Sequence, residues 1–259
     1  MEVYGADFYD AYFVGVDGDV GFYTEEAVRS GSPVLELGCG SGRVTLPIAR
    51  SGVDVVGLDK SRDLRELARR KATSEVGERV SFVCGDLTDF CLTRQFALIA
   101  IPYRTFQHLY AVADQEMALQ CIHEHLTRDG LLIFDTFDPH QLLVGEGWCS
   151  GLRKDTDFIH PESGRRVVVW YDRDYDPQLQ LLEQELVFEE LEPDGAVCSR
   201  SSRRLTLRHS HRWEMEYLLE RCGFVVEALY GDFYGGEYPG FGDQVWVARK
   251  VDFDAAHGA

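Results

Sequence analysis

Three glycines and one aspartate are spaced in the sequence as they are in nucleoside-binding sites. Gly38, Gly40 and Gly42 follow a short apolar run, and Asp59 closes the next apolar run, Val53 to Leu58. Glycine reaches backbone conformations that are closed to other residues and lets a ligand approach the backbone closely. An aspartate at the carboxyl end of a parallel strand can accept hydrogen bonds from ribose hydroxyls. Together, these residues predict that a nucleoside is bound here.

A strand, a turn, a helix and a second strand are needed to position these residues, and the surrounding sequence predicts them. The run Val34 to Leu37 is typical of a buried parallel strand, and Val44 to Ala49 supplies apolar positions for a helix. The helix follows the glycines directly, so its unpaired N–H groups suit an anionic or strongly polar ligand. This arrangement is half of a doubly wound α/β sheet.

The spacing of the glycines separates two kinds of nucleoside site. A dinucleotide site uses G-x-G-x-x-G, and Arg43 stands where its third glycine belongs. The stretch from Glu36 to Gly42, ELGCGSG, closely resembles motif I of the class I S-adenosylmethionine-dependent methyltransferases. The resemblance implies an α/β, Rossmann-like fold with a doubly wound seven-stranded sheet whose last strand is antiparallel. It also implies S-adenosyl-L-methionine as donor, S-adenosyl-L-homocysteine as product, and no metal.

The same resemblance assigns residues to the donor. It places Asp59 on the ribose, and Asp86, which follows the predicted strand Val80 to Cys84, on the adenine amino group. Either aspartate alone could be an ordinary turn residue at a strand end, whereas the two together fit an adenosine site. The residues predicted to bind the donor are Tyr9, Glu36, Gly38, Cys39, Gly40, Gly42, Arg43, Asp59, Lys60, Asp86, Leu87 and Ile101.

The segment after a fourth predicted strand, Phe96 to Ile101, is the candidate acceptor side, because ligands of open α/β sheets bind at the carboxyl ends of strands. In the resembled family this segment lies beside the transferred methyl group. Histidine titrates near neutral pH, so His108 is the candidate general base; the alternative is a structural histidine facing a neighbouring helix. Tyr12, Tyr103 and Arg104 are predicted to bind the acceptor, and Arg104 could hold an acidic one.

The predicted elements divide the chain into five parts. Residues 1–31 are rich in aromatics and contain the segment YDAY, which is similar to a lid of small-molecule methyltransferases; a hydrophobic flap packed on the domain is the alternative. Residues 32–137 and 209–251 form the Rossmann-like core, and 252–259 form a tail. Residues 138–208 are predicted to form hairpin-linked antiparallel strands. We expect this inserted β subdomain to cover the acceptor site; a dimer surface or added core is the alternative.

Composition argues against several function classes. The 259 residues include 44 acidic and 26 basic side chains, a net charge of −18, which argues against a nucleic-acid substrate. The seven cysteines contain no C-x-x-C pair, so neither a disulfide framework nor a structural zinc site is expected. The apolar runs are too short to span a bilayer and no charged-then-apolar leader opens the chain. These features predict a cytoplasmic protein without membrane association.

The predicted function is methyl transfer from S-adenosylmethionine to a small-molecule oxygen or nitrogen by in-line displacement, with His108 as a candidate base. The alternatives are a nicotinamide-dependent oxidoreductase, against which Arg43 counts, and a non-catalytic S-adenosyl ligand-binding protein. A nucleic-acid methyltransferase is disfavoured because IPYR, at 101–104, departs from the N-P-P-Y type of segment. The partners considered are the small-molecule acceptor and a second copy of the chain in a homodimer.

Overall fold

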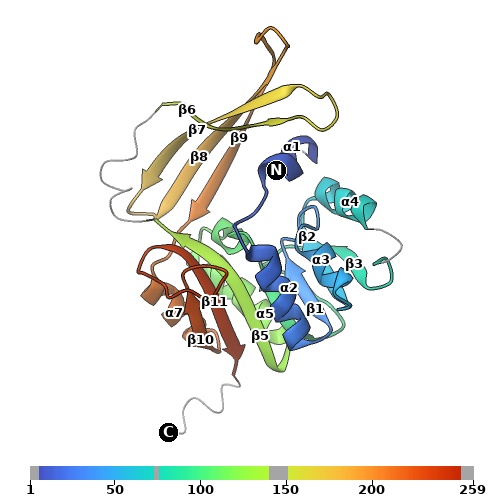
Figure 1. Ribbon diagram of the computed structural model, residues 1–259. Coiled ribbons are helices and arrows are strands. Elements are labelled where there is room, and N and C mark those ends of the chain that lie inside the picture. The colour runs from blue at the N-terminus through green and yellow to red at the C-terminus, as the bar shows by residue number, and fades with distance from the viewer. Residues whose placement is uncertain (1–5, 73–75, 140–150, 252–259) are drawn as a thin grey trace. The chain divides into compact units, whose positions relative to one another are not determined.

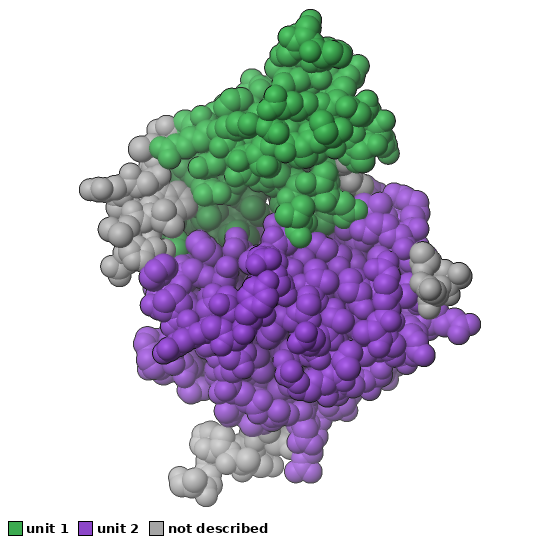
Figure 2. All heavy atoms as spheres, viewed as in Figure 1, with its two compact units in different colours: residues 1–14, 139–209 green, residues 15–138, 210–259 purple. Residues whose placement is uncertain are grey.

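The computed structural model describes residues 6–72, 76–139 and 151–251 of the chain. They form two compact units, which Figure 2 shows in different colours. The α/β unit comprises residues 15–138 and 210–259, and the β unit comprises residues 1–14 and 139–209. The β unit is therefore made of an N-terminal segment and a long insertion into the α/β unit.

A seven-stranded sheet forms the centre of the α/β unit, in the order β10-β11-β5-β4-β1-β2-β3. β11 is antiparallel to both of its neighbours, whereas the other neighbouring strands pair in parallel. The prediction of a Rossmann-like sheet with its last strand antiparallel is confirmed. The strands are β1 (Val34–Leu37), β2 (Val55–Asp59), β3 (Val80–Cys84), β4 (Phe96–Ile101), β5 (Leu126–Asp138), β10 (Phe224–Tyr230) and β11 (Gly242–Lys250).

Helices of the α/β unit cover both faces of its sheet (Figure 1). Alternate residues of a strand point to opposite faces. Leu35 and Leu37 of β1 therefore pack in one buried cluster with residues of α5 and α7, whereas Val34 packs in another with residues of α2 and α3. The helices are α2 (Asp19–Ser30), α3 (Thr45–Arg50), α4 (Arg62–Lys71), the 3₁₀ helix η1 (Thr105–His108), α5 (Val112–His125) and α7 (Arg212–Arg221).

Apolar runs bounded by turn residues predicted many of these elements closely. β3 and β4 span the predicted residues, and Ser61 caps α4, its hydroxyl accepting a hydrogen bond from the Leu64 N–H. β5 differs, because the sequence predicts a turn at 128–130 and a strand from residue 131. In the structure, Leu126 already pairs with Phe96 of β4, and Leu131 pairs with Leu98. The residues between them therefore form an irregularity within one strand.

The β unit contains a four-stranded antiparallel sheet in the order β6-β7-β8-β9. The inserted antiparallel sheet is as predicted. The strand-like runs that the sequence indicates here are residues 167–171, 179–191 and 203–208, and β6 was missed because its sequence is polar and mostly exposed. Helix α1 (Ala6–Tyr12) packs here: the Phe8 ring stacks on Phe188 with centroids 5.2 Å apart, and the Tyr12 hydroxyl donates to Asp155 at 2.7 Å. The strands are β6 (Arg153–Ile159), β7 (Arg166–Asp176), β8 (Leu181–Leu191) and β9 (Val197–Arg208).

The first 31 residues, which the sequence groups into one lid segment, divide between the two units. α1 belongs to the β unit, and α2 belongs to the α/β unit. The roles of the N-terminal segment as a lid and of the insertion as a cover stay predictions, and the predicted tail lies outside the described residues. None of the described helices combines the length and the apolar character that crossing a membrane requires.

Candidate donor and acceptor site

The glycine turn follows β1 at the carboxyl edge of the sheet. Gly38, Gly40 and Gly42 all have positive φ angles, of 72°, 52° and 82°, which residues with a Cβ rarely adopt. A Cβ built on Gly38 would lie 2.3 Å from Thr105 Cγ2. The turn therefore requires glycine for its own conformation and, at Gly38, for the close approach of the segment that follows β4.

Asp59 ends β2 beside this turn. Its carboxylate accepts hydrogen bonds from the Gly40 N–H at 2.8 Å and from the Ser61 N–H at 2.7 Å. A carboxylate has about four acceptor positions, so these bonds orient the side chain and leave capacity for further donors such as ribose hydroxyls. Lys60, the next predicted donor residue, is exposed.

Three of the residues predicted to bind the methyl donor contribute apolar packing. Ile101 is buried in the same cluster against which the half-buried Leu87 packs. The Cys39 side chain is buried, and a Cβ on Gly57 of β2 would lie 2.9 Å from the Cys39 sulfur. Burial raises the pKa of the Cys39 thiol well above its usual value. Cys39 therefore packs the turn onto the sheet and is not poised as a nucleophile.

Glu36 brings a buried carboxyl group to the end of β1. It is 2% exposed and accepts a hydrogen bond from the Thr45 hydroxyl at 2.5 Å. Burial raises the pKa of this carboxyl group to about 8. A positively charged ligand would favour the ionised form, so the residues present fit a nucleoside that also carries positive charge. S-adenosylmethionine is such a ligand.

Two further residues predicted to bind the methyl donor interact with other side chains or backbone of the α/β unit. The Arg43 guanidinium makes a bidentate ion pair with Asp19, at 2.8 and 2.7 Å, and lies 5.1 Å from the centroid of the Tyr103 ring. Asp86 follows β3 and accepts from the N–H of Thr88 at 3.0 Å and from its hydroxyl at 2.8 Å. The Thr88 N–H bond is the main cause that lowers the Asp86 pKa. Arg43 thus connects the turn to α2, and Asp86 is held ionised just after β3, the strand beside β2.

Residues 34–130 match a protein family described as a methyltransferase domain. The match runs from β1 into β5 and includes the glycine turn, Asp59 and Asp86. Residues 34–130 are therefore similar to a methyltransferase domain, as the resemblance of the glycine turn implies. The resemblance to methyltransferases is therefore confirmed for this segment of the α/β unit.

The chain matches only part of the length of its curated relatives. The chain is 32% identical over 106 residues to the malonyl-[acyl-carrier protein] O-methyltransferase of Priestia megaterium, which covers 40% of this chain and 36% of that protein. It is 30% identical over 139 residues to the dTDP-3-amino-3,6-dideoxy-alpha-D-glucopyranose N,N-dimethyltransferase of Streptomyces fradiae. The aligned segment covers 50% of this chain and 52% of that protein. The chain therefore spans about half or less of these relatives.

Solved structures match nearly the whole chain. The CcbJ methyltransferase from Streptomyces caelestis has a TM-score of 0.79 at 22% identity, with 95% of this chain and 96% of that chain covered. An S-adenosylmethionine-dependent methyltransferase from Clostridium acetobutylicum has a TM-score of 0.78 at 16% identity, with coverages of 95% and 98%. At these identities the likeness shows the fold alone.

The predicted acceptor side of the site begins with a sharp turn after β4. Tyr103 and Arg104 both have positive φ angles, of 58° and 60°. Arg104 makes an ion pair with Asp243 of β11 at 2.8 Å, and its guanidinium lies 4.7 Å from the centroid of the Phe137 ring. An acidic acceptor would have to compete with Asp243 for this guanidinium. The acceptor roles of Tyr103 and Arg104 stay predictions.

His108 ends η1 and is half-buried. Its neighbour Gln107 makes two hydrogen bonds with the backbone of Phe137. Nε2 donates to the carbonyl at 3.1 Å, and Oε1 accepts from the N–H at 2.9 Å. η1 is therefore fixed beside the end of β5, at the sheet edge that also carries the glycine turn and Asp59. The place fits a base, and the role of His108 stays a prediction.

Two buried aspartates of β5 were missed as site residues. Asp135 is 1% exposed and Asp138 is 3% exposed. The carboxyl group of Asp135 accepts from the Tyr23 hydroxyl and from the N–H groups of Tyr103 and Arg104. Burial raises its pKa to about 6. The available signal was an aspartate inside an otherwise apolar strand, LLIFDTF.

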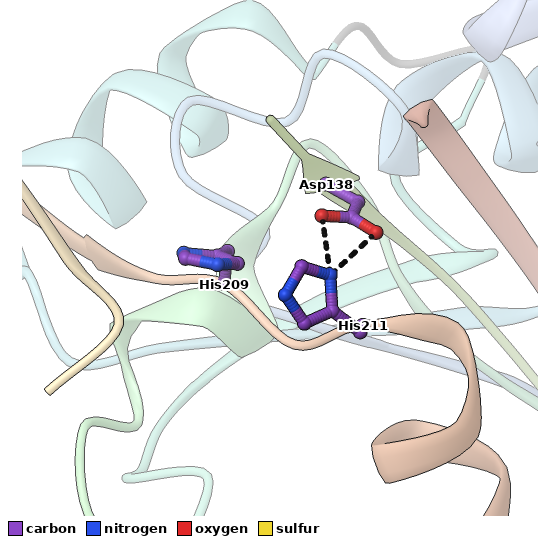
Figure 3. A group of neighbouring side chains, drawn as sticks. All are labelled: Asp138, His209 and His211. Atoms are coloured by element: carbon purple, nitrogen blue, oxygen red, sulfur yellow. Dashed lines mark hydrogen bonds and ion pairs between the residues drawn. The ribbon is translucent and has the colours of Figure 1, made fainter. Parts of the chain in front are cut away.

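The Asp138 carboxylate lies within hydrogen-bond distance of His211, which directly precedes α7 (Figure 3). The His211 Nδ1 lies 3.0 Å from Oδ1 and 3.1 Å from Oδ2 of Asp138. The Tyr238 hydroxyl also donates to Oδ2, at 3.0 Å. The pair therefore joins the end of β5 to the start of α7. His209, which is drawn as well, belongs to the β unit, where its Nε2 lies 3.1 Å from the Tyr175 hydroxyl.

Most predicted site residues are brought to one edge of the α/β unit, but two are not part of that unit. Tyr9 and Tyr12 belong to the β unit. The Tyr9 ring packs on Phe13 with centroids 5.1 Å apart, and Tyr12 is bonded to Asp155. Their contacts with donor and acceptor stay predictions.

Proposed function

We propose that the protein transfers a methyl group from S-adenosylmethionine to an oxygen or nitrogen of a small-molecule acceptor. The observation that carries the proposal is the convergence of Glu36, the glycine turn and Asp59 at one sheet edge. One similar protein is named as an N,N-dimethyltransferase of a nucleotide-linked amino sugar and another as an O-methyltransferase. These names support both oxygen and nitrogen as the methylated atom.

The proposed work of the chain is binding, orientation and proton removal. S-adenosylmethionine, when bound, supplies a methyl group that its sulfonium has already activated. Asp59 would hold the ribose, Asp86 the adenine, and Glu36 would offset positive charge. Orientation alone can contribute about 7–11 kcal/mol to lowering a reaction barrier, whereas a general base adds a factor of about 10²–10⁴. Positioning is therefore the larger contribution that we propose.

Thermal unfolding with candidate ligands tests the donor assignment. We expect S-adenosylmethionine and S-adenosylhomocysteine to raise the midpoint, and NAD and NADP to leave it unchanged. A ligand present at a hundred times its dissociation constant adds about 2.7 kcal/mol. For a chain of this size each kcal/mol corresponds to roughly 2–4 °C. A shift with a nicotinamide nucleotide alone would instead favour the oxidoreductase, and donor binding without turnover of any acceptor would favour a binding protein.

His108→Ala tests the proposed base. We expect the turnover number to fall by a factor of about 10²–10⁴ while the affinity for S-adenosylmethionine, measured by calorimetry, is preserved. His211→Ala is the comparison, because His211 is also a histidine near this edge and is paired with Asp138. If His211→Ala lowers turnover and His108→Ala does not, the base has been assigned to the wrong histidine.

A further inference from the structure

The chain makes a strained turn directly after β4. Tyr103 and Arg104 have φ angles of 58° and 60°, and among the described residues only one other non-glycine residue, Gln180, has a positive φ. Two consecutive side-chain-bearing residues in this region cost free energy and persist only when their surroundings hold them. The question is what holds this turn.

One carboxylate of β5 accepts hydrogen bonds from both strained residues. Oδ1 of Asp135 accepts from the Tyr103 N–H at 2.7 Å, and Oδ2 accepts from the Arg104 N–H at 2.9 Å. The Tyr23 hydroxyl of α2 donates to Oδ1 as a third partner, at 2.7 Å. Hydrogen bonds to an ionised acceptor are stronger than those between neutral groups. The Asp135 carboxylate is therefore a sufficient physical reason for the turn.

The turn sets the place of the residues that follow it. Thr105 lies so close to the glycine turn that a Cβ on Gly38 would be 2.3 Å from the Thr105 Cγ2. The same short segment ends at His108. Because a misplacement of about 1 Å can cost a factor of 10² in rate, a group that fixes this segment affects the chemistry without touching a substrate.

We propose that Asp135 is a positioning residue for the methyltransferase reaction: through the backbone of Tyr103 and Arg104 it holds Thr105 against the glycine turn and fixes the segment that carries His108. The inference rests on the proposed function, but its structural part can be tested without an acceptor. The titratable and charged groups that face Asp135 or its hydrogen-bond partners are Tyr23, Tyr103, Arg104, Asp19, Arg43 and Glu36.

The test compares Asp135→Asn with the control Tyr23→Phe in the full chain. An asparagine keeps the shape but presents an NH₂ group where one of the two backbone N–H groups needs an acceptor. Tyr23→Phe removes a donor to the same carboxylate and leaves both backbone contacts in place. Hydrogen exchange of residues 103–108 and the calorimetric affinity for S-adenosylmethionine are measured for both variants.

We expect Asp135→Asn to accelerate exchange in residues 103–108, but not in β1 or β2, and to weaken S-adenosylmethionine binding about tenfold or more, as loss of a charge-assisted hydrogen bond would. Tyr23→Phe should change neither. Glu36 should make the affinity fall with falling pH in both proteins. In the wild type a further fall is expected below about pH 6, where Asp135 takes up a proton, and this further fall should be absent in Asp135→Asn. A merely structural carboxylate would not produce that difference in pH profile.

Three results would overturn the inference: unchanged exchange and affinity in Asp135→Asn, equal losses in Tyr23→Phe, or fast exchange of the Tyr103 and Arg104 amides in the wild type. The wild-type measurement decides the matter even if Asp135→Asn does not fold. If S-adenosylmethionine binds neither the wild type nor the variants, the proposed function fails, whereas the exchange comparison still tests whether Asp135 holds the turn.

Discussion

Asp59→Ala should weaken the binding of S-adenosylmethionine and S-adenosylhomocysteine by about 10- to 100-fold, the loss expected for hydrogen bonds to a charged group worth about 1.5–3 kcal/mol. Two effects add. The proposed ribose contacts are lost, and the Gly40 N–H loses the carboxylate that connects the glycine turn to β2. Calorimetric titration with both ligands measures the change.

Asp54→Ala is the matched control. Asp54 lies just before β2, at the strand end opposite to Asp59, and its partly exposed carboxylate pairs with Arg79 at 3.2 Å. Its removal should leave donor affinity unchanged. Asp59→Asn should fall between the wild type and Asp59→Ala, because the amide oxygen can still accept one bond. Equal affinities in Asp59→Ala and the wild type would remove Asp59 from the donor site.

Glu36→Gln should abolish a large dependence of folding stability on pH. The pKa of Glu36 is raised from 4.5 to about 8 by burial, so between these values the folded chain holds a proton that the unfolded chain has released. The free energy of unfolding of the wild type therefore falls as the pH rises through this window, by an amount on the order of 5 kcal/mol. Above about pH 8 the cost of the buried charge is complete, and Glu36→Gln should be the more stable protein.

Urea unfolding at several pH values between 5 and 9 measures this difference. Glu66→Gln is the control, because Glu66 is a glutamate of α4 on the surface, paired with Arg62 at 2.8 Å. Its pKa is lowered by that hydrogen bond, so it contributes no loss of stability with rising pH in this window. Glu36→Gln should also bind S-adenosylmethionine more weakly. Asp135, whose pKa is raised to about 6, contributes a slope of the same sign below that pH. If the slope between pH 6 and 8 survives in Glu36→Gln, a buried group other than Glu36 causes it.

The sequence predicted those parts of the fold that depend on local patterns. Short apolar runs ended by turn residues located β3 and β4, and the spacing of the glycines identified the turn after β1. β6 was missed because strand formation at a polar, exposed edge depends on pairing with β7 rather than on its own residues.

The missed parts of the candidate site depend on contacts between distant residues. Arg43 binds Asp19, 24 residues earlier, and nothing in the local sequence of either residue indicates the pairing. Asp135 acts on backbone N–H groups of Tyr103 and Arg104, which every residue but proline possesses. A contact with backbone leaves no pattern in side-chain types, so only a structure reveals it.

The contact between Asp138 and His211 bears on how the inserted segment can vary in length and sequence. The insertion leaves the α/β unit after Asp138 and returns before His211, and these side chains meet at 3.0 Å. An inserted segment whose two ends lie close together can be lengthened, shortened or replaced without displacing the elements that flank it. Here those elements are β5 and α7. The α/β unit, with its proposed donor site, can therefore stay constant while the insertion differs among related proteins.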